Sequence, residues 1–210
     1  EEWINDRTRF AYDGLKAQRL DRPYIRDAQS GKLRGTDWQE VLDVLGQRLA
    51  QTDPSKIAAL SGDLCDVESM VALKDLLDTL GVQNRDCRLA GESMDVSARG
   101  NYLFNTGIEN LENADAILMI GTNPRWEATM VNTRIRKNWV DNRIPIGVIG
   151  EGRDLSYPYQ ALGMTPQTIQ DLIDETLDFA QTLKDAKRPA VIVGSGAFLR
   201  KDGEALQALI

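Results

Sequence analysis

The sequence predicts an α/β fold in which helices cover both faces of a parallel β-sheet. Short apolar runs such as Ala116–Ile120 alternate with longer segments whose apolar residues recur every three or four positions. Glycine or proline follows most of these runs and marks turns. Strands that alternate with helices of this length form right-handed βαβ units, and such units build parallel sheets.

Helix-end signals place several of the expected elements. Thr36-Asp37-Trp38-Gln39 has the form of a capping box, with Thr36 as the N-cap and Gln39 bonding back to it. A later helix has Glu68 in its first turn, and Gly81 is expected as its C-cap. The expected elements are strands around Tyr24–Arg26 and Lys32–Arg34, a helix from Thr36 to about Gln51, a buried strand at Lys56–Gly62, a helix over Val67–Leu80, a minor strand at Asn84–Cys87, a short helix around Ser97–Phe104, a central strand at Ala116–Ile120, a helix from Pro124 to about Val140, a strand at Ile144–Ile149, a loop over 150–166, a helix at Thr168–Leu183, and a strand and turn in Arg188–Phe198 before the start of a last helix.

These elements suggest three parts along the chain. Residues 1–35 are expected to form an extended lead-in with short strands, residues 36–166 an α/β domain, and residues 167–210 a helix and the start of a second, truncated βα unit. The chain begins with Glu1 rather than methionine and ends within a helical pattern. Both ends therefore predict a segment of a longer protein.

Composition excludes several functions. The net charge of −7 argues against nucleic-acid binding, which depends on neutralising phosphates with lysine and arginine. No apolar stretch approaches the roughly 20 residues that a membrane-spanning helix needs, so direct membrane insertion is not expected. The chain has no histidine, which removes the commonest general base and the commonest neutral metal ligand.

The two cysteines do not indicate a metal framework. Cys65 and Cys87 are 22 positions apart and form no C-x-x-C motif, so neither an iron–sulfur nor a zinc site is expected within this chain. A disulfide and two small buried thiols are the alternatives, of which the buried thiols are favoured.

The loop Gly121–Arg125 has the strongest ligand-site pattern. It follows the expected central strand, Asn123 can cap the next helix, and Pro124 suits the first helical position. The free amides of Arg125 and Trp126 would then point outward from the carboxyl end of the strand, where open α/β sheets bind anions. An efficient strand-to-helix turn without a ligand explains the same pattern equally well.

Two further glycine-bearing turns follow strands, at Gly147–Gly152 and Gly194–Phe198. Neither completes a G-x-G-x-x-G fingerprint, because Leu199 stands where the third glycine belongs. We therefore do not expect nucleotide binding at either turn.

The helix expected from Pro124 to Val140 carries an excess of positive charge. A solvated helix face is the favoured explanation, and docking of an acidic partner is the alternative. In the docking case, charge reversal at Arg134 and Arg136 should impair assembly without lowering the melting temperature. Trp126 and Trp139 are expected in the core rather than at a recognition surface. The charged residues are Arg125, Arg134, Arg136, Lys137 and Arg143, against Glu127 and Asp141.

Two groups of carboxylates have the spacing of helix starts. Capping explains them better than acid–base catalysis. They are Asp63 with Asp66, and Asp171 with Asp174 and Glu175.

In order and spacing, these segments resemble the molybdopterin oxidoreductases over essentially the whole chain. The resemblance is carried by "RLDRPYIRDAQSGKLRGTDWQEVLDVLGQRLA", "IAALSG", "VESMVALKDLLDTLG" and "IENLENADAILMIGTNPRWEA". The last of these matches the Gly-x-Asn-Pro loop on the pterin side of that superfamily. The resemblance implies a three-layer, Rossmann-like parallel-sheet fold of the formate dehydrogenase/DMSO reductase type.

Within this superfamily the chain is similar to the large iron–sulfur subunits of respiratory complex I, the proton-pumping NADH:quinone oxidoreductases. That similarity is carried by "EEWINDRTRFAYDGLKAQRLDRPYIR", "NRDCRLAG", "NPRWEATMVNTRIRKNW" and "IGVIGEGRDLSYPYQALG". It implies 2Fe-2S and 4Fe-4S clusters in a preceding part of the subunit, other peripheral-arm subunits as partners, and a peripheral location on the cytoplasmic side of a bacterial inner membrane or the mitochondrial matrix side.

The resemblance also implies a lost metal ligand. Catalytic members place a cysteine or selenocysteine, which binds molybdenum, between the second helix and the Gly-x-Asn-Pro loop. Ala90 stands at that position here, followed by Gly91, and Cys87 lies three positions early. A methyl group has no lone pair to donate to a metal. We therefore expect an empty, vestigial pterin-side loop at Gly121, Thr122, Asn123, Pro124 and Arg125, no catalytic residue, and no cofactor or metal within this chain.

The expected role is therefore structural, in support of electron transfer by the rest of the subunit. One alternative is a molybdopterin-dependent, formate dehydrogenase-like fragment, with pterin or nucleotide at Gly121–Arg125 and Gly194–Ala197. A second is the nucleotide-binding middle domain of a thiamine-diphosphate enzyme, because "RPAVIVGSGA" is similar to its opening strand.

Overall fold

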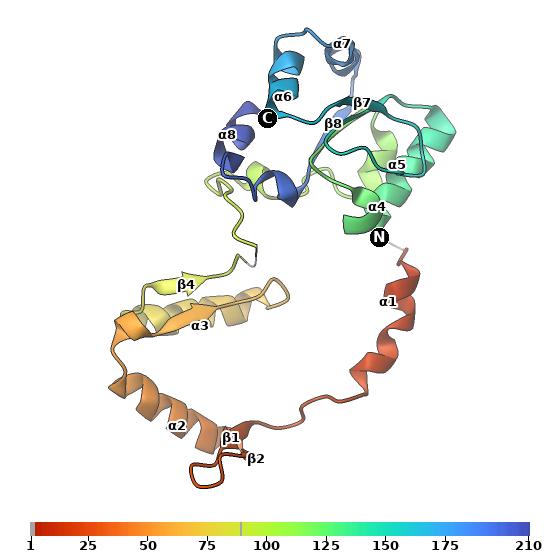
Figure 1. The fold of residues 1–210 in the computed structure, drawn as a ribbon. Coiled ribbons are helices and arrows are strands. Elements are labelled where there is room, and N and C mark those ends of the chain that lie inside the picture. Colours follow the sequence, from red (N-terminus) through yellow and green to blue (C-terminus); the bar gives the residue numbers. More distant parts are fainter. Residues whose placement is uncertain (1–2, 89) are drawn as a thin grey trace. The chain divides into compact units, whose positions relative to one another are not determined.

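A four-stranded parallel β-sheet forms the centre of the C-terminal part of the chain in the computed structural model (Figure 1). The structure describes residues 3–88 and 90–210. The strands lie in the order β7-β6-β5-β8, and every neighbouring pair is parallel. They are β5 (Ala116–Ile120), β6 (Ile146–Ile149), β7 (Gln160–Gly163) and β8 (Pro189–Val193). A mixed α/β fold with a parallel sheet is thus confirmed.

Helices cover both faces of this sheet. All five residues of β5 are buried, and their side chains alternate between two apolar clusters. One cluster holds Met119 and Ile135 and is closed by η4 (Glu109–Asn113) and α5 (Thr129–Asn142). The cluster on the opposite face includes Phe179. It is closed by α6 (Pro166–Ile173), α7 (Asp178–Asp185) and α8 (Gly203–Leu209), with α8 packed beside α6.

The order of the strands creates a reversal beside β5. The chain passes from β5 to β6 and then to β7 in one direction, and β8 returns to pair with the other side of β5. The loops that follow β5 and β8 therefore leave the same edge of the sheet in opposite directions. Open α/β sheets bind ligands in the crevice that such a reversal leaves at the carboxyl ends of the strands.

The chain divides into two units by internal contacts: residues 10–89 form one, and the sheet unit comprises residues 90–210 with the first nine. This division differs from the expected boundaries, which joined residues 36–166 and separated 167–210. The sheet explains the difference, because β8 pairs with β5 along all five residues and so ties the last segment to the central strand.

The unit over residues 10–89 contains small sheets and two longer helices. Strands β1 and β2 pair antiparallel, whereas β3 and β4 pair in parallel, and β4 runs alongside α3 (Figure 1). Each strand has three residues, whereas the strand predicted at Lys56–Gly62 was longer. The elements are β1 (Tyr24–Arg26), β2 (Leu33–Gly35), α2 (Trp38–Gln51), η2 (Pro54–Lys56), β3 (Ala58–Leu60), α3 (Val67–Leu80) and β4 (Asn84–Asp86).

Little apolar surface is buried in this unit. Among its described residues, only Leu77 and Val82 count as buried apolar side chains. The prediction of a buried strand at Lys56–Gly62 is wrong, because both end residues of β3 are exposed. The prediction of buried thiols is wrong for the same reason, since Cys65 and Cys87 are free and exposed. A two-stranded sheet with one layer of helices leaves most side chains without cover.

The ends of α2 and α3 are capped by the predicted types of residue, but the N-cap of α2 lies one position later than expected. Asp37, not Thr36, is the N-cap of α2, and its carboxylate accepts the Glu40 amide at 2.9 Å. The Thr36 hydroxyl donates to the Glu40 carboxylate instead. Asp66 caps α3 by accepting the Ser69 amide at 2.7 Å, whereas no cap bond is found for Asp63 in the described chain. The Gly81 C-cap of α3 is confirmed by its left-handed φ of 72°.

Both long helices expected in the sheet unit are interrupted. The first divides into α4 (Pro124–Glu127) and α5 at Ala128, whose φ of −149° is not helical. The second divides into α6 and α7, because Glu175 adopts a positive φ of 59°. Apolar periodicity continues across both breaks, so the sequence pattern did not indicate them.

The second break changes the role of the expected capping carboxylates. Asp171 and Asp174 lie at the end of α6 rather than at a helix start, and they accept bonds from glutamine side chains one turn earlier. Glu175 forms an ion pair with Lys184. The capping assignment for these three residues is therefore wrong.

Several short elements differ from the expected irregular structure. Strand β7 lies in the segment expected to be a loop, and α1 (Asp6–Phe10) and η1 (Tyr12–Leu15) lie in the lead-in expected to be extended. The short helix expected around Ser97–Phe104 is only the 3₁₀ turn η3 (Arg99–Asn101). Within the described residues, no helix has the length and apolar character needed to span a membrane.

Candidate functional site

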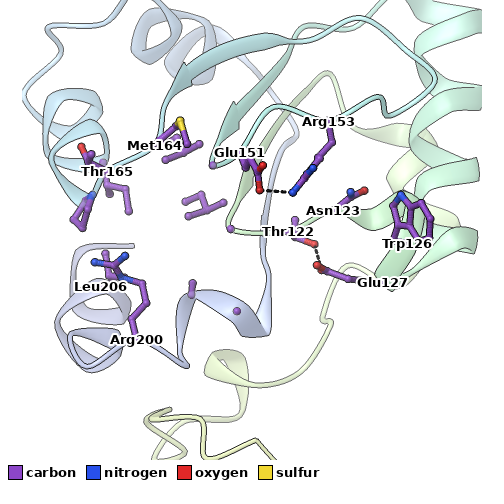
Figure 2. A pocket seen from close by; sticks show the side chains of 18 residues that line it. Thr122, Asn123, Trp126, Glu127, Glu151, Arg153, Met164, Thr165, Arg200 and Leu206 are labelled. Carbon is purple, nitrogen blue, oxygen red and sulfur yellow. Dashed lines mark hydrogen bonds and ion pairs between the residues drawn. The ribbon is translucent and has the colours of Figure 1, made fainter.

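A pocket of about 630 Å³ opens at the carboxyl ends of the parallel strands (Figure 2). Its walls come from the loops after the four strands, from α4, from the first turn of α6 and from Leu206 of α8. It therefore lies at the strand-order reversal. The lining residues are Ile120, Gly121, Thr122, Asn123, Trp126, Glu127, Ile149, Gly150, Glu151, Arg153, Met164, Thr165, Pro166, Ile169, Gly196, Ala197, Arg200 and Leu206.

Glycine allows the loops after β5 and β8 to approach closely. A side chain at Gly194 would place its Cβ 2.4 Å from the Gly121 carbonyl oxygen and 2.7 Å from the Thr122 Cβ. Gly121 itself has a φ of +59°, and the nearest atom to an added Cβ is the Ala197 Cβ at 3.3 Å. Packing of the two loops, rather than a phosphate, accounts for glycine at both positions.

The structure places part of the predicted Gly121–Arg125 loop at the pocket. Gly121, Thr122 and Asn123 line it, whereas Pro124 is buried at the first position of α4. Arg125 is not among the lining residues. Its guanidinium forms an ion pair with Asp154 and donates to the Asp154 carbonyl at 3.0 Å.

Two expectations for the polar groups of this loop are wrong. The Asn123 side chain does not cap α4, and its buried Oδ1 has no partner in the described structure. The Trp126 amide is not free for a ligand either, because it donates to the Asn123 carbonyl at 3.0 Å. The loop therefore uses its own amide at Trp126 to close the turn, and the sequence prediction of two outward-pointing amides is wrong at this residue.

Most charged groups of the pocket are neutralised locally. Glu151 forms an ion pair with Arg153, and Arg200 pairs with Asp202 at 2.7 Å. The Arg200–Asp202 hydrogen bonds raise the pKa of the guanidinium and lower the pKa of the carboxyl group. The remaining carboxylate, Glu127, accepts a hydrogen bond from the Thr122 hydroxyl at 2.7 Å.

The loop after β6 is fixed by its own polar contacts. The Tyr159 hydroxyl accepts the Arg153 amide and donates to the Arg153 carbonyl, both at 2.8 Å. The Ser156 amide and Arg125 both donate to Asp154, and these bonds lower the pKa of its carboxyl group. The wall that carries Glu151 and Arg153 is therefore held by the residues around it.

Sequence reasoning did not place several of the lining residues at the pocket. Arg153, Met164 and Thr165 flank β7, in the segment expected to be a loop, and Arg200 follows the glycine turn after β8. The glycine turns at Gly150 and Gly194 were a partial signal for the pocket. Each follows a strand, and the carboxyl ends of parallel strands lie at one edge of the sheet. The sequence did not predict β7, and α6 begins directly after that strand. The start of α6 was therefore not expected at this edge of the sheet.

The basic stripe expected on the helix after β5 is only partly exposed. Arg134 is buried, with 4% of its side chain exposed, and it forms an ion pair with Glu112. Lys137 pairs with the same carboxylate, and the Trp3 ring lies 4.6 Å from the Arg134 guanidinium. Arg136 remains exposed. The expectation that Arg134 faces solvent or a partner is therefore wrong, because the lead-in and η4 cover it.

The two tryptophans near this helix have different environments. Trp139 is half-buried and carries the Arg143 guanidinium 4.2 Å above its ring. Trp126 is 81% exposed at the edge of the pocket (Figure 2). The prediction of a core position is wrong for Trp126, because the break at Ala128 gives α4 its own orientation.

The described residues that line the pocket provide carboxylates but no thiolate or imidazole. No cysteine or histidine lines the pocket, and Ala90 is not among its lining residues. In the described part of the chain, no group of three or more histidine, cysteine, aspartate or glutamate side chains could hold a metal ion. Leu89, which precedes the expected ligand position, lies outside the described residues.

A comparison with protein-family models identifies the family of this chain. The model of the molybdopterin oxidoreductase family matches residues 19–210, which is most of the chain. The chain belongs to the molybdopterin oxidoreductase family. This membership leaves no support for the thiamine-diphosphate enzyme alternative.

This member of the molybdopterin oxidoreductase family matches relatives that are named as parts of NADH dehydrogenase or NADH-quinone oxidoreductase. The chain is 42% identical over its full length to the mitochondrial NADH dehydrogenase [ubiquinone] iron-sulfur protein 1 of Solanum tuberosum, and it covers 28% of that protein. It is 42% and 43% identical, also over its full length, to a subunit of the NADH-quinone oxidoreductases of Rickettsia bellii and Rickettsia felis, of which it covers 30% and 31%. The chain thus spans about 30% of the length of the curated relatives it matches.

Proposed function

We propose that this chain is a segment of the large iron–sulfur subunit of an NADH:quinone oxidoreductase, respiratory complex I, and that the segment is structural rather than catalytic. The observation that supports the first part is identity of 42–43% along the entire chain to an iron–sulfur protein of NADH dehydrogenase and to subunits of NADH-quinone oxidoreductases. In this proposal, 2Fe-2S and 4Fe-4S clusters lie in other parts of the subunit, and this segment binds no cofactor.

The side-chain chemistry supports a non-catalytic role. Ala90 stands where the resemblance to catalytic molybdopterin enzymes requires a sulfur or selenium donor, and its methyl group has no lone pair. The carboxylates that line the pocket are engaged by Thr122 and Arg153. A formate dehydrogenase-like activity would therefore lack its metal ligand.

The fold assignment also extends beyond a parallel sheet. We propose a three-layer, Rossmann-like unit of the formate dehydrogenase/DMSO reductase type. The order β7-β6-β5-β8 supports it, because it corresponds to the order 3-2-1-4 that begins a doubly wound sheet. A rigid body of this kind would support the cluster-bearing part and contact other peripheral-arm subunits, on the cytoplasmic side of a bacterial membrane or the mitochondrial matrix side.

Metal and pterin analysis of the complete native subunit tests the absence of catalysis. We expect no stoichiometric molybdenum or tungsten by mass spectrometry and no pterin fluorescence after oxidative extraction. A formate dehydrogenase treated in parallel serves as the positive control. One equivalent of either metal per subunit would overturn the structural role.

Assembly of the complex provides the complementary test. The Arg134→Ala change, which removes a buried ion pair, should lower the amount of assembled complex but leave NADH:quinone turnover per assembled complex unchanged. Arg136→Ala, on the same helix but exposed, is the matched control. Fully assembled complex with reduced turnover would show instead that this segment takes part in electron transfer.

A further inference from the structure

The exposed indole of Trp126 is the starting point. Tryptophan is the largest side chain, and its 81% exposure places a wide π-face in water at the edge of the pocket (Figure 2). A single exposed apolar residue needs no special explanation. Tryptophan is nevertheless enriched at interaction sites, because its rigid ring buries a large area at little entropic cost. Its neighbours decide whether it is such a site.

Glu127 follows Trp126 in α4 and brings a carboxylate to the same pocket. Its carboxylate lines the same pocket and accepts a hydrogen bond from Thr122. Unlike Glu151, it forms no ion pair with any residue in the described chain. Arg125, the nearest cation along the sequence, is held by Asp154. The pocket edge therefore combines an open aromatic face with a carboxylate that has no cationic partner within the described residues.

Elsewhere in the same chain, arginine side chains lie against tryptophan rings. The Arg134 guanidinium lies 4.6 Å from the Trp3 ring centroid and forms an ion pair with Glu112. Arg143 likewise lies 4.2 Å above the Trp139 ring. Guanidinium groups favour such sites because the ring quadrupole attracts the cation while the carboxylate accepts its hydrogen bonds. Trp126 and Glu127 provide the aromatic ring and the acid without the arginine.

We propose that Trp126 and Glu127 form a recognition site for an arginine side chain from a neighbouring protein subunit. The net charge of −7 on this chain favours a basic partner segment. Trp126 and Glu127 both line this pocket, which is open to solvent. The identification of the partner as a subunit rests on the proposed structural role. Recognition of a guanidinium group does not depend on that role.

A peptide titration followed by NMR tests the guanidinium site. The probe is acetyl-Gly-Arg-Gly-amide, and the control is the same peptide with citrulline, which is neutral and nearly isosteric. We expect the Trp126 indole N–H resonance to shift with the arginine peptide and not with citrulline. Trp139 already carries Arg143, and Trp38 is exposed outside the pocket, so their indole resonances should not move. Equal shifts at Trp126 and Trp38 would overturn the site.

Two variants separate the contributions of the ring and the acid. Trp126→Leu and Glu127→Gln should each weaken peptide binding about 2- to 5-fold, as expected for exposed cation–π and ion-pair contacts. The effect of Glu127→Gln should shrink at 0.5 M salt. Trp38→Leu is the matched control and should leave binding unchanged. Unchanged binding in both pocket variants would contradict the proposal.

A cross-link in the intact complex identifies the partner. A benzoylphenylalanine in place of Trp126 should, on irradiation, attach to a segment of another subunit that carries an arginine next to the modified residue. Attachment to a segment without arginine, or only to the same subunit, would refute the proposed partner. None of these results changes the metal content of the subunit, so failure of this inference and failure of the structural role can be distinguished.

Discussion

The Arg134 guanidinium is enclosed by the fold and forms an ion pair with Glu112, whose side chain is 23% exposed. The ion pair joins α5 to η4, and Trp3 covers it from the lead-in. Burial of this arginine requires both contacts, since an unpaired buried charge is strongly unfavourable. Arg134 therefore stabilises the fold and does not offer its charge to a partner.

Arg134→Ala should lower the free energy of unfolding by about 3 kcal/mol, near the lower limit for a broken buried ion pair because Lys137 still accompanies Glu112. Urea denaturation followed by circular dichroism measures the change. Arg136→Ala, at an exposed position of the same helix, should remain within about 0.5 kcal/mol of the unmodified chain. Equal effects of the two substitutions would contradict the assignment of Arg134 to the interior.

Acid should weaken the same cluster. Hydrogen bonds from Lys137 and Arg134 lower the pKa of Glu112 in the folded state. A lowered folded-state pKa stabilises the fold above the unfolded pKa of about 4.3, and this contribution is lost as the pH falls through the folded value. Urea midpoints measured between pH 6 and pH 3 should therefore decline less for Glu112→Gln than for the unmodified chain. Parallel declines would argue against a role for this carboxyl group.

The N-cap of α2 can be located by paired substitutions. Asp37→Ala removes the carboxylate that accepts the Glu40 amide and should cost about 1 kcal/mol of helix stability. Asp37→Asn retains an acceptor and should cost less. Thr36→Val should have a smaller effect than Asp37→Ala, since the Thr36 hydroxyl donates to the Glu40 side chain and Asp37 is the N-cap. A larger loss at Thr36, read from helical ellipticity, would restore the capping box that the sequence suggested.

Close packing of the loops after β5 and β8 predicts an asymmetry between two glycines. Gly194→Ala would place a methyl group 2.4 Å from the Gly121 carbonyl and should destabilise the chain by about 1–3 kcal/mol. Gly196→Ala meets the same oxygen at 3.5 Å, an ordinary contact, and should change stability by less than about 0.5 kcal/mol. Thermal unfolding compares the two. A tolerated Gly194→Ala would mean that the loops are not in contact.

Exposure of both thiols is directly measurable. Cys65 and Cys87 are free and exposed, so two equivalents of Ellman's reagent should react with the native chain without denaturant. Single Cys65→Ser and Cys87→Ser variants should each react with one equivalent. A native chain that reacts only after denaturation would restore the buried thiols expected from the sequence.

Local signals in the sequence were sufficient for most individual elements. The apolar run of β5, the Asp66 and Gly81 ends of α3 and the short strand β4 all depend on neighbours a few residues away. The breaks at Ala128 and Glu175 could not be predicted in this way, because apolar periodicity runs across them. After the break at Glu175, α7 contacts β5, and a contact between such distant segments is a long-range requirement.

The pocket was predicted only in part for a related reason. Gly121, Thr122 and Asn123 were recognised because a glycine follows an apolar run and precedes a helix start. Arg153 and Arg200 lie about 30 and 80 positions further along and carry no local signal. Their place at the pocket depends on β7 and β8 being neighbours of β6 and β5, which the order of elements along the chain does not specify.

The amino-acid sequence by itself determined the α/β class, the parallel sheet, the loop after the central strand and the family, because periodicity, turn residues and motif order are properties of the chain. Tertiary structure alone decided that Arg134 is enclosed while Trp126 stands in solvent, although both were expected to lie on a single helix. The physical reason is that burial depends on what packs against a side chain, and here the covering residues, Trp3 and Glu112, come from segments far from α5 in the chain.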